Sequence, residues 1–271
     1  MATSGTQLGN DATTNNNTFL RANGDGSFSI CKGTAASPTE IFKINANGSV
    51  SQTLFPKATM SVALYASVST TAATGGFSAP SSGATTYTLP TGCQFVRVTV
   101  IGGGGGGGGV SASAYNSSAG GGQGGTSIKF VTPSATESCQ VGVGGTAGAN
   151  TGGTGGTGGT TNFGSHCSAT GGTGGGGATV PGNISGGIGG SGSSGTVNLT
   201  GEAGGRAFGY AAGTSFISGN GGGEGGGAGN VNVAGGAGSN GGGGGGVGTG
   251  GSAYAGGAGG QGMIIVEEFY S

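Results

Sequence analysis

Alternation of apolar and polar residues predicts strands in the carboxy-terminal two-thirds of the chain. The clearest stretch is QFVRVTVI at 94–101, in which side chains would alternate between two faces of an extended backbone. One face carries Val96, Val98 and Val100, and the other carries Phe95, Arg97, Thr99 and Ile101. A Pro-Thr-Gly turn separates it from a shorter strand, and further candidates are TSIKFV at 126–131, SCQVGV at 138–143 and MIIVEEF at 263–269. We expect the last of these to pair with 94–101 and so to tether the intervening chain at both ends.

Short strands joined by tight turns are predicted in the first 57 residues. FLRANGDGSFSI (19–30) and IFKINANGSVS (41–51) each place apolar residues on both sides of an Asn-Gly-containing turn, where positive φ angles are tolerated. The shared Ala-Asn-Gly core makes these two segments a weak internal repeat. Because each copy would bury little apolar surface, either the units stack or neighbouring chains complete the core.

Composition changes divide the chain into three predicted regions. Residues 1–57 form the β-repeat region, which we assign to attachment or trimerisation, and residues 58–83 are small, uncharged and linker-like. Within this linker, MSVALYASV could be a short helix or a strand. Residues 84–271 form a glycine-rich distal domain, since 68 of the 77 glycines lie beyond residue 90.

Glycine runs interrupt the strand pattern, and two interpretations compete. Glycine-rich tracts usually behave as flexible coil, since glycine loses the most backbone freedom on folding. However, only 6% of residues are charged, unlike typical disordered chains, and strand patterns bracket the runs on both sides. Ordering each residue costs about 1–2 kcal/mol, so an ordered alternative requires dense main-chain hydrogen bonding. We favour such a lattice, with the runs 102–109 and 241–246 buried inside it.

A threonine repeat indicates the geometry of this lattice. In TGGTGGTGGT, the residues Thr151, Thr154, Thr157 and Thr160 recur every three positions. A polyproline-II-type helix has three residues per turn, so all four threonines would lie on one edge and glycine on the other two. Glycine edges allow neighbouring backbones to approach and hydrogen-bond. The predicted fold is therefore all-β, with amino-terminal β-repeats followed by a glycine-rich β-sandwich and packed polyglycine-II-type helices.

Charge and targeting signals exclude several classes of protein. The formal net charge is −1, so there is no basic surface for nucleic acid or anionic membrane. No apolar stretch approaches the ~20 residues that span a bilayer, and the first residues lack the basic and apolar regions of a secretory signal. We therefore expect no membrane insertion and accumulation in the cytoplasm of the producing cell.

Candidate chemistry is sparse, and we predict neither an enzyme nor a cofactor nor a metal site. Cys31, Cys93, Cys139 and Cys167 are widely spaced and are interpreted as buried or free thiols rather than disulfides. The only histidine, His166, adjoins Cys167, but neighbouring residues on a strand point to opposite faces. Glycine patterns that resemble phosphate loops are not evidence of a nucleotide site here, because so glycine-rich a chain matches them by composition alone. No Gly-Lys-Ser/Thr follows any glycine run.

Interruptions of the glycine runs are the candidate binding loops. Large rings on a glycine scaffold have little core to enter, and aromatics flanked by Asn, Ser and Gly are typical of adaptable binding loops. The candidate receptor-binding residues are Tyr115, Asn116, Arg206, Phe208, Tyr210, Phe216 and Tyr254. For Phe208 and Phe216 the alternative is that they fill a small core between loop and lattice or lie in a trimer interface.

The ordered set of motifs resembles a known family. YTLPTGCQFVRVTVIGGGGGGGG, GGGQGGTSIKFVTP, CQVGVGG, GGTGGTTNFGS and GGAGGQGMIIVEEFYS are similar, in this order, to the glycine-rich domain of bacteriophage tail fibre and tail tip proteins. The resemblance covers residues 84–271. The first 57 residues resemble, more loosely, the β-repeats of phage fibre shafts.

This resemblance implies a receptor-binding virion protein. We expect a homotrimer, assembled in the host cytoplasm, whose loops contact a protein or glycan of the bacterial surface and whose residues 1–57 contact other tail or baseplate proteins. A purely structural tail tip or baseplate component is the alternative. An ice-binding protein is a third hypothesis, since glycine-helix lattices with threonine edges can present flat ordered faces.

Overall fold

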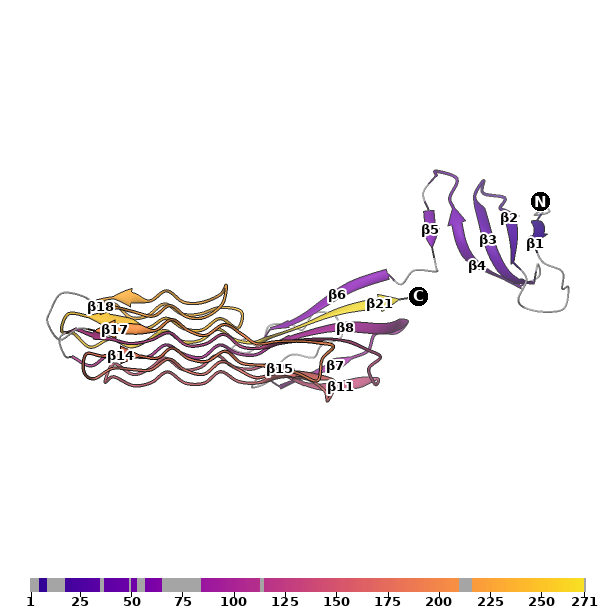
Figure 1. Ribbon diagram of the computed structural model, residues 1–271. Coiled ribbons are helices and arrows are strands. Elements are labelled where there is room, and N and C mark those ends of the chain that lie inside the picture. The colour runs from indigo at the N-terminus through magenta and orange to yellow at the C-terminus, as the bar shows by residue number, and fades with distance from the viewer. Residues whose placement is uncertain are drawn as a thin grey trace. The chain divides into compact units, whose positions relative to one another are not determined.

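The computed structural model describes residues 5–8, 18–34, 37–48, 50–52, 57–64, 84–112, 115–209 and 216–270 (Figure 1). Over these residues the fold is all-β and contains no helix, as predicted. Consequently, no described helix is long and apolar enough to cross a membrane. The chain divides into two compact units, one comprising Met1–Ala58, Gly92–Gln94 and Phe269–Ser271, and the other Thr59–Thr91 and Phe95–Glu268.

The first unit contains a five-stranded antiparallel sheet in sequence order. Its strands are β1 (Gly5–Leu8), β2 (Thr18–Ala22), β3 (Phe28–Thr34), β4 (Ser37–Ile44) and β5 (Val50–Gln52). Both predicted hairpins are confirmed, because β2 pairs with β3 and β4 pairs with β5 across the Asn-Gly turns. Gly26 and Gly48 close these turns at φ angles of 82° and 80°, which glycine adopts readily.

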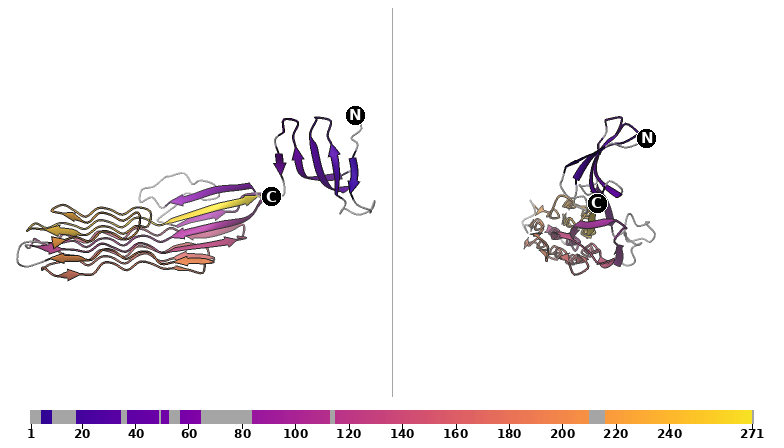
Figure 2. Two further views of the ribbon diagram at one scale, coloured as in Figure 1. Left: turned by 45° about the horizontal axis from the view of Figure 1, so that its top comes forward. Right: turned by 90° about the vertical axis from the view of Figure 1, so that its right-hand side faces the viewer.

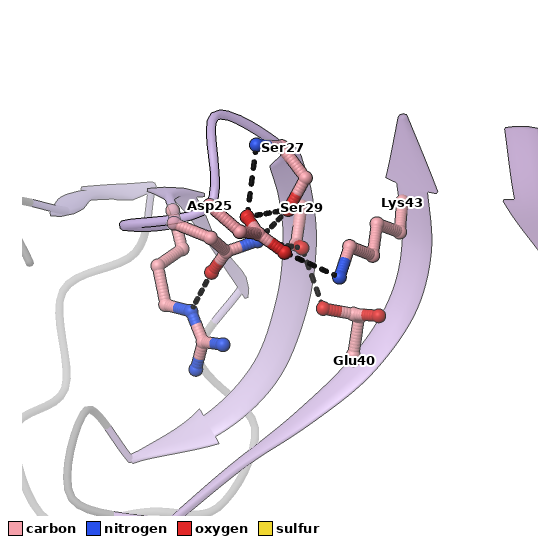
Figure 3. A network of polar contacts seen from close by, with 7 residues as sticks. Asp25, Ser27, Ser29, Glu40 and Lys43 are labelled. Atoms are coloured by element: carbon pink, nitrogen blue, oxygen red, sulfur yellow. Dashed lines mark hydrogen bonds and ion pairs between the residues drawn. The ribbon is translucent and has the colours of Figure 1, made fainter. Parts of the chain in front are cut away.

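A polar network stabilises the β2–β3 turn (Figure 3). Asp25 Oδ1 accepts hydrogen bonds from the amide of Ser27 at 2.9 Å and from its hydroxyl at 2.6 Å. Lys43 Nζ lies 3.4 Å from Asp25 Oδ2, which links the turn to β4. The hydrogen bonds from Ser27 lower the pKa of Asp25 to about 2. Ser29 Oγ donates to Glu40 Oε2 at 2.5 Å, so the network extends across the sheet.

Two five-stranded sheets form the base of the second unit. The first has the order β16-β10-β8-β21-β6 and the second the order β15-β13-β12-β11-β7, and β10 contacts both β13 and β15. The first sheet comprises β6 (Lys57–Leu64), β8 (Cys93–Ile101), β10 (Thr126–Val131), β16 (Val197–Leu199) and β21 (Met263–Tyr270). The second comprises β7 (Ala84–Thr88), β11 (Thr136–Gln140), β12 (Thr161–Phe163), β13 (Cys167–Ala169) and β15 (Gly192–Ser193).

The predicted tether between distant strands is confirmed. β8 and β21 are neighbours in one sheet, so the chain between them begins and ends at the same base. Val96, Val98 and Val100 are fully buried, as their alternation predicts. Arg97 Nη1 on the opposite face of β8 forms an ion pair with Glu267 Oε2 of β21 at 2.6 Å. β6 begins at Lys57 and ends at Leu64, so the segment 58–83 predicted as a linker starts with a strand of this sheet, and its residues 65–83 lie outside the described part.

One predicted strand boundary is wrong. The alternation in SCQVGV predicts a strand over 138–143, but β11 covers Thr136–Gln140. Beyond it the chain enters the glycine lattice, where Gly142 donates to the hydroxyl of Thr161 and Val143 is 43% exposed. The alternation of valine and glycine therefore reflects the start of a three-residue repeat and not a longer strand.

The base has an apolar core with one buried polar pair. Tyr87 and Phe163 contact each other with ring centroids 5.3 Å apart, and both are fully buried. Tyr87 donates its hydroxyl hydrogen to Glu268 Oε1 at 2.9 Å, and Glu268 is 2% exposed. All four cysteines are buried and free, as predicted. Burial raises the pKa of Cys139 and of Cys167 to about 11, which disfavours the reactive thiolate.

The run 102–109 forms the centre of a hydrogen-bonded lattice (Figure 1, parallel wavy segments). Gly102, Gly103 and Gly104 donate to three different neighbouring segments. From Gly105 onward, successive amides donate to the same three segments in the same order. This three-residue repeat is that of a polyproline-II-type helix. Six segments surround the run: it donates to 119–125, 151–160 and 255–262, and accepts from 142–149, 170–177 and 241–246.

Two further runs are enclosed in the same way. The segments 119–125 and 241–246 are each hydrogen-bonded to six neighbours, including 102–109 and each other. We call 102–109, 119–125 and 241–246 the inner runs. The predicted burial of 102–109 and 241–246 is confirmed, whereas 119–125 was not predicted to be an inner run. This run contains one large side chain, Gln123, whose Oε1 accepts the amide hydrogen of Glu202. The side chain fits because Gly223, which lies against it, has no Cβ.

The remaining segments form a closed ring around the inner runs. These perimeter runs, each hydrogen-bonded to the next and the last to the first, are 142–149, 151–160, 170–177, 185–191, 201–206, 218–222, 225–229, 234–239 and 255–262. The right panel of Figure 2 views the second unit end-on, with its segments close-packed. The predicted threonine edge is confirmed, since Thr151, Thr154, Thr157 and Thr160 are all exposed and the glycines between them are half-buried.

Candidate binding surface at the loop end of the lattice

Two small sheets close the lattice at the end opposite the base, where Figure 1 labels β14, β17 and β18 of the first. One has the order β14-β17-β18, formed by Asn183–Ile184, Ala207–Gly209 and Phe216–Ile217. The other has the order β19-β20-β9, formed by Asn230–Val231, Val247–Thr249 and Asn116–Ser117. β9 contacts both β17 and β18, so the two sheets lie together. We call this end of the lattice the tip.

A compact apolar cluster fixes the tip to the inner runs. Val110, Ala178 and Val247 are buried against one another, and Ile184 and Tyr254 pack onto them. Val110 directly follows the glycines of the central run, and its amide donates to the Tyr254 carbonyl at 2.9 Å. Larger side chains thus appear where the lattice ends, because no close-packed backbone neighbour excludes them there.

Two predicted residues lie at the start of β9, Tyr115 directly before the strand and Asn116 as its first residue. Tyr115 is half-buried with a φ of 63°, an uncommon left-handed conformation for a residue other than glycine. Asn116 is fully buried, and its Nδ2 donates to Ser111 Oγ at 3.2 Å. Asn116 therefore supports the loop in this structure and presents no exposed surface. Its Oδ1 and the hydroxyl of Ser117 have no hydrogen-bond partner within the described residues.

The other predicted residues are distributed unevenly over the tip. Arg206 is exposed directly before β17, and Phe208 within β17 is 37% exposed. Phe216 pairs with Gly209 across β17 and β18, while Tyr210 lies outside the described residues. Tyr254 is half-buried because it packs on the apolar cluster. The structure thus brings Tyr115, Asn116, Phe208, Phe216 and Tyr254 to one end of the lattice.

A row of exposed residues crosses the β14-β17-β18 sheet. Asn183 pairs with Phe208, which pairs with Ile217, and Ile217 is 62% exposed. Other exposed aliphatic residues of the tip are Val180 (66%), Val231 (49%) and Val233 (55%). The residues predicted from the sequence did not include these aliphatic side chains.

The tip carries no formally charged side chain. The sequence of its loops, 110–119, 178–185, 207–218, 229–235 and 247–255, contains no Asp, Glu, Lys, Arg or His. Arg206 is the nearest charge in sequence. An uncharged surface with exposed apolar residues makes contacts by desolvation and shape, because it has no charges for long-range attraction.

The titratable groups near His166 belong to the base and not to the tip. His166 Nε2 lies 3.0 Å from Glu137 Oε1, which also accepts the amide hydrogen of Ser134 at 2.9 Å. Burial raises the pKa of Glu137, but the hydrogen bonds from His166 and Ser134 outweigh it and the pKa is lowered below 4.5. The sequence did not reveal this glutamate partner, since 29 residues separate the two. The pair fixes the turn between β12 and β13.

The lattice and its tip have a counterpart among known sequence families. Residues 78–268 match a family described as a glycine-rich domain, and this match covers the lattice, the tip and the base without β6 and the last residues of β21. The chain belongs to this glycine-rich domain family. A search of curated proteins gave no match to it. The family description names a glycine-rich domain and assigns no function to the tip.

Proposed function

We propose that this glycine-rich domain protein is a bacteriophage tail fibre protein that binds a receptor on the bacterial surface through its tip. The observation that carries the proposal is the contrast between the two parts of the lattice. Its body is hydrogen-bonded backbone whose outward side chains are mostly small, with Ile188 as an exposed exception, whereas its tip exposes Phe208, Ile217 and Val180 together on an uncharged surface. Exposed apolar groups of this kind mark interaction sites.

The lattice supports recognition because its stability does not depend on the side chains of the loops at the tip. Its stability resides in main-chain bonds between glycines, so residues of the tip are free to vary without loss of the body. A surface held on such a scaffold is pre-organised, which reduces the entropy lost on binding. The proposed partner is a protein or glycan of the bacterial envelope.

The remaining parts of the proposal concern assembly. The resemblance to fibre shaft repeats supports attachment of residues 1–57 to other tail or baseplate proteins and a homotrimeric state. The protein would then reside in the virion after assembly in the host cytoplasm. A purely structural role in a tail tip or baseplate is the competing proposal, and it requires no exposed apolar tip.

Binding to bacterial cells tests the proposal directly. Labelled full-length protein is incubated with a panel of bacterial strains, and phage adsorption is measured on each strain that it decorates. We expect decoration of a subset of strains and blocked adsorption on these. Absence of decoration on every strain whose phages carry this protein would support the structural role.

Point substitutions at the tip are a sharper test than a deletion of 201–220. That deletion would remove the perimeter run 201–206, which is hydrogen-bonded to 119–125, 185–191 and 218–222. The double variant Phe208→Ser/Ile217→Ser changes only the exposed row, and Ile188→Ser, at a position 70% exposed on the lattice perimeter, is the control. Binding lost in the double variant and kept in the control supports the tip as the receptor site. Equal binding by both places the contact elsewhere.

Ice binding is a second candidate because the threonine face is wider than the sequence indicated. Exposed threonines occur on three consecutive perimeter runs: Thr146, the four threonines of 151–160, and Thr170 with Thr173. The hydroxyls of Thr170 and Thr173 accept amide hydrogens from Ser191 and Ile188, which orders this face. Thermal hysteresis of the purified protein decides this candidate, and a freezing point equal to the melting point excludes it.

A further inference from the structure

The perimeter runs resemble the exposed edges of a β-sheet in their main-chain groups. In the run 151–160, the amides of Gly155, Gly156, Gly158 and Gly159 donate within the lattice. The amides of Thr154 and Thr157 are not among the donors found in the described residues, and both threonines are exposed. Every third amide therefore faces solvent. Rows of unpaired main-chain donors and acceptors are templates for association with another chain.

The same arrangement recurs on a face lined mostly by alanine. The perimeter runs 234–239, 255–262 and 142–149 are consecutive, since Gly238 donates to Ala258 and Gly259 donates to Gly145. Their outward residues include Ala237, Ala258 and Thr146, which are exposed and whose amides make no main-chain bond within the described residues. We call these three runs the alanine face.

Close approach inside the lattice depends on the absence of Cβ atoms. A Cβ built on almost any glycine of the inner runs would overlap a carbonyl of a neighbouring run, as at Gly104 with Gly242 and at Gly107 with Gly245. A single methyl group is thus enough to prevent two runs from reaching hydrogen-bonding distance. On the perimeter, the outward position of the triplet is filled by alanine, threonine, serine or a larger residue in almost every turn.

We infer that the perimeter faces could hydrogen-bond to the polyglycine-type helices of a second copy of this chain. The outward side chains prevent this association because they hold the two backbones apart. The partner is a second copy because its perimeter has the same three-residue period, so donors and acceptors of two faces match in register over their whole length. The outward side chains thereby prevent the lattice from extending into a second molecule. This inference does not depend on the proposed receptor-binding function.

Removing the outward side chains from one face tests the inference. The triple variant Thr146→Gly/Ala237→Gly/Ala258→Gly clears the centre of the alanine face, and Thr146→Ser/Ala237→Ser/Ala258→Ser is the matched control. Sedimentation velocity is measured for both and for the wild type over a range of concentrations. We expect species larger than the wild type only for the glycine variant, in proportions that grow with concentration, together with new exchange protection of the amides at 237 and 258.

Two results would overturn the inference. One is a folded glycine variant, with the inner runs protected from exchange, that sediments as the wild type at all concentrations. The other is equal association of the serine variant, because an outward side chain would then not be the barrier. Should the triple variant fail to fold, Thr154→Gly/Thr157→Gly on the run 151–160, judged by the same two measurements, carries the test.

Discussion

Individual glycines of the inner runs are irreplaceable for a steric reason. A Cβ at Gly105 would overlap the carbonyl of Thr173, and this carbonyl cannot move because it accepts a hydrogen bond from Gly122. The substitution Gly105→Ala should therefore lower the free energy of unfolding by about 3 kcal/mol or more. Gly182→Ala is the control, since nothing lies within 4 Å of its Cβ position, and it should be neutral or stabilising by up to about 1 kcal/mol. Urea unfolding measures both, and similar values would contradict the lattice geometry.

A second residue-scale prediction concerns the Glu137–His166 pair. Because the pKa of Glu137 is lowered in the folded state, its stabilising contribution is present above pH 4.5 and is lost as the pH falls through the folded-state pKa. The wild type should lose melting temperature more steeply below pH 4.5 than Glu137→Gln does. Thermal unfolding between pH 3 and pH 7 measures the difference. Parallel curves would show that the pair does not contribute in this way.

At the scale of the element, the two sheets of the base depend on a buried hydrogen bond. Tyr87 of β7 donates to Glu268 of β21 in a fully buried position, and removing one partner of a buried hydrogen bond costs about 1–3 kcal/mol. Tyr87→Phe should therefore destabilise the protein by about 2 kcal/mol in urea unfolding. Tyr254→Phe, at a half-buried position of the tip, should change stability by less than about 0.5 kcal/mol. A neutral Tyr87→Phe would mean that Glu268 is satisfied without the tyrosine.

The perimeter run 151–160 makes a prediction of its own for amide exchange. The amides of Gly155, Gly156, Gly158 and Gly159 are hydrogen-bonded, whereas those of Thr154 and Thr157 face solvent. Exchange measured by NMR should therefore show protection with a period of three residues, with the threonine amides fast and the glycine amides slow. Uniformly fast exchange along the run would show that it is coil.

At the scale of the whole molecule, the arrangement separates a charged base from an uncharged tip. If the tip is the receptor site, as we propose, association with receptor-bearing cells should depend little on ionic strength, because no charged side chain lies in its loops. Between 50 and 500 mM NaCl we expect the apparent affinity of the wild type to change by less than about threefold. A loss of tenfold or more would indicate that Arg206 or the base carries the contact.

The loops of the tip show the limit of prediction from sequence. Reasoning from ring size singled out Tyr115, Phe208 and Tyr254, and the structure does bring them to one end of the lattice. It also places Ile217 beside Phe208 on a common exposed row. Asn116 was predicted from its neighbours in the chain, yet it is fully buried in β9. Exposure depends on which loops meet, and no local pattern contains that information.

The sequence by itself determined the periods of the backbone. Alternation at 94–101 and 263–269 specified two strands of one sheet, and the three-residue spacing from Thr151 to Thr160 specified which edge of a run faces outward. Both follow from local geometry, since side-chain direction repeats every two residues in a strand and every three in an extended helix.

Only the tertiary structure decided which runs lie inside and how they are connected. Glycine has no side chain to distinguish one run from another, so 102–109 and 119–125 acquire their positions from hydrogen bonds to six neighbours each. The same holds for Glu137 beside His166 and for the exposed row on the tip, which join residues far apart in the chain. In a lattice held by main-chain hydrogen bonds, the sequence specifies the three-residue repeat of each run. The position of each run is specified by the hydrogen bonds that join the perimeter runs into a closed ring.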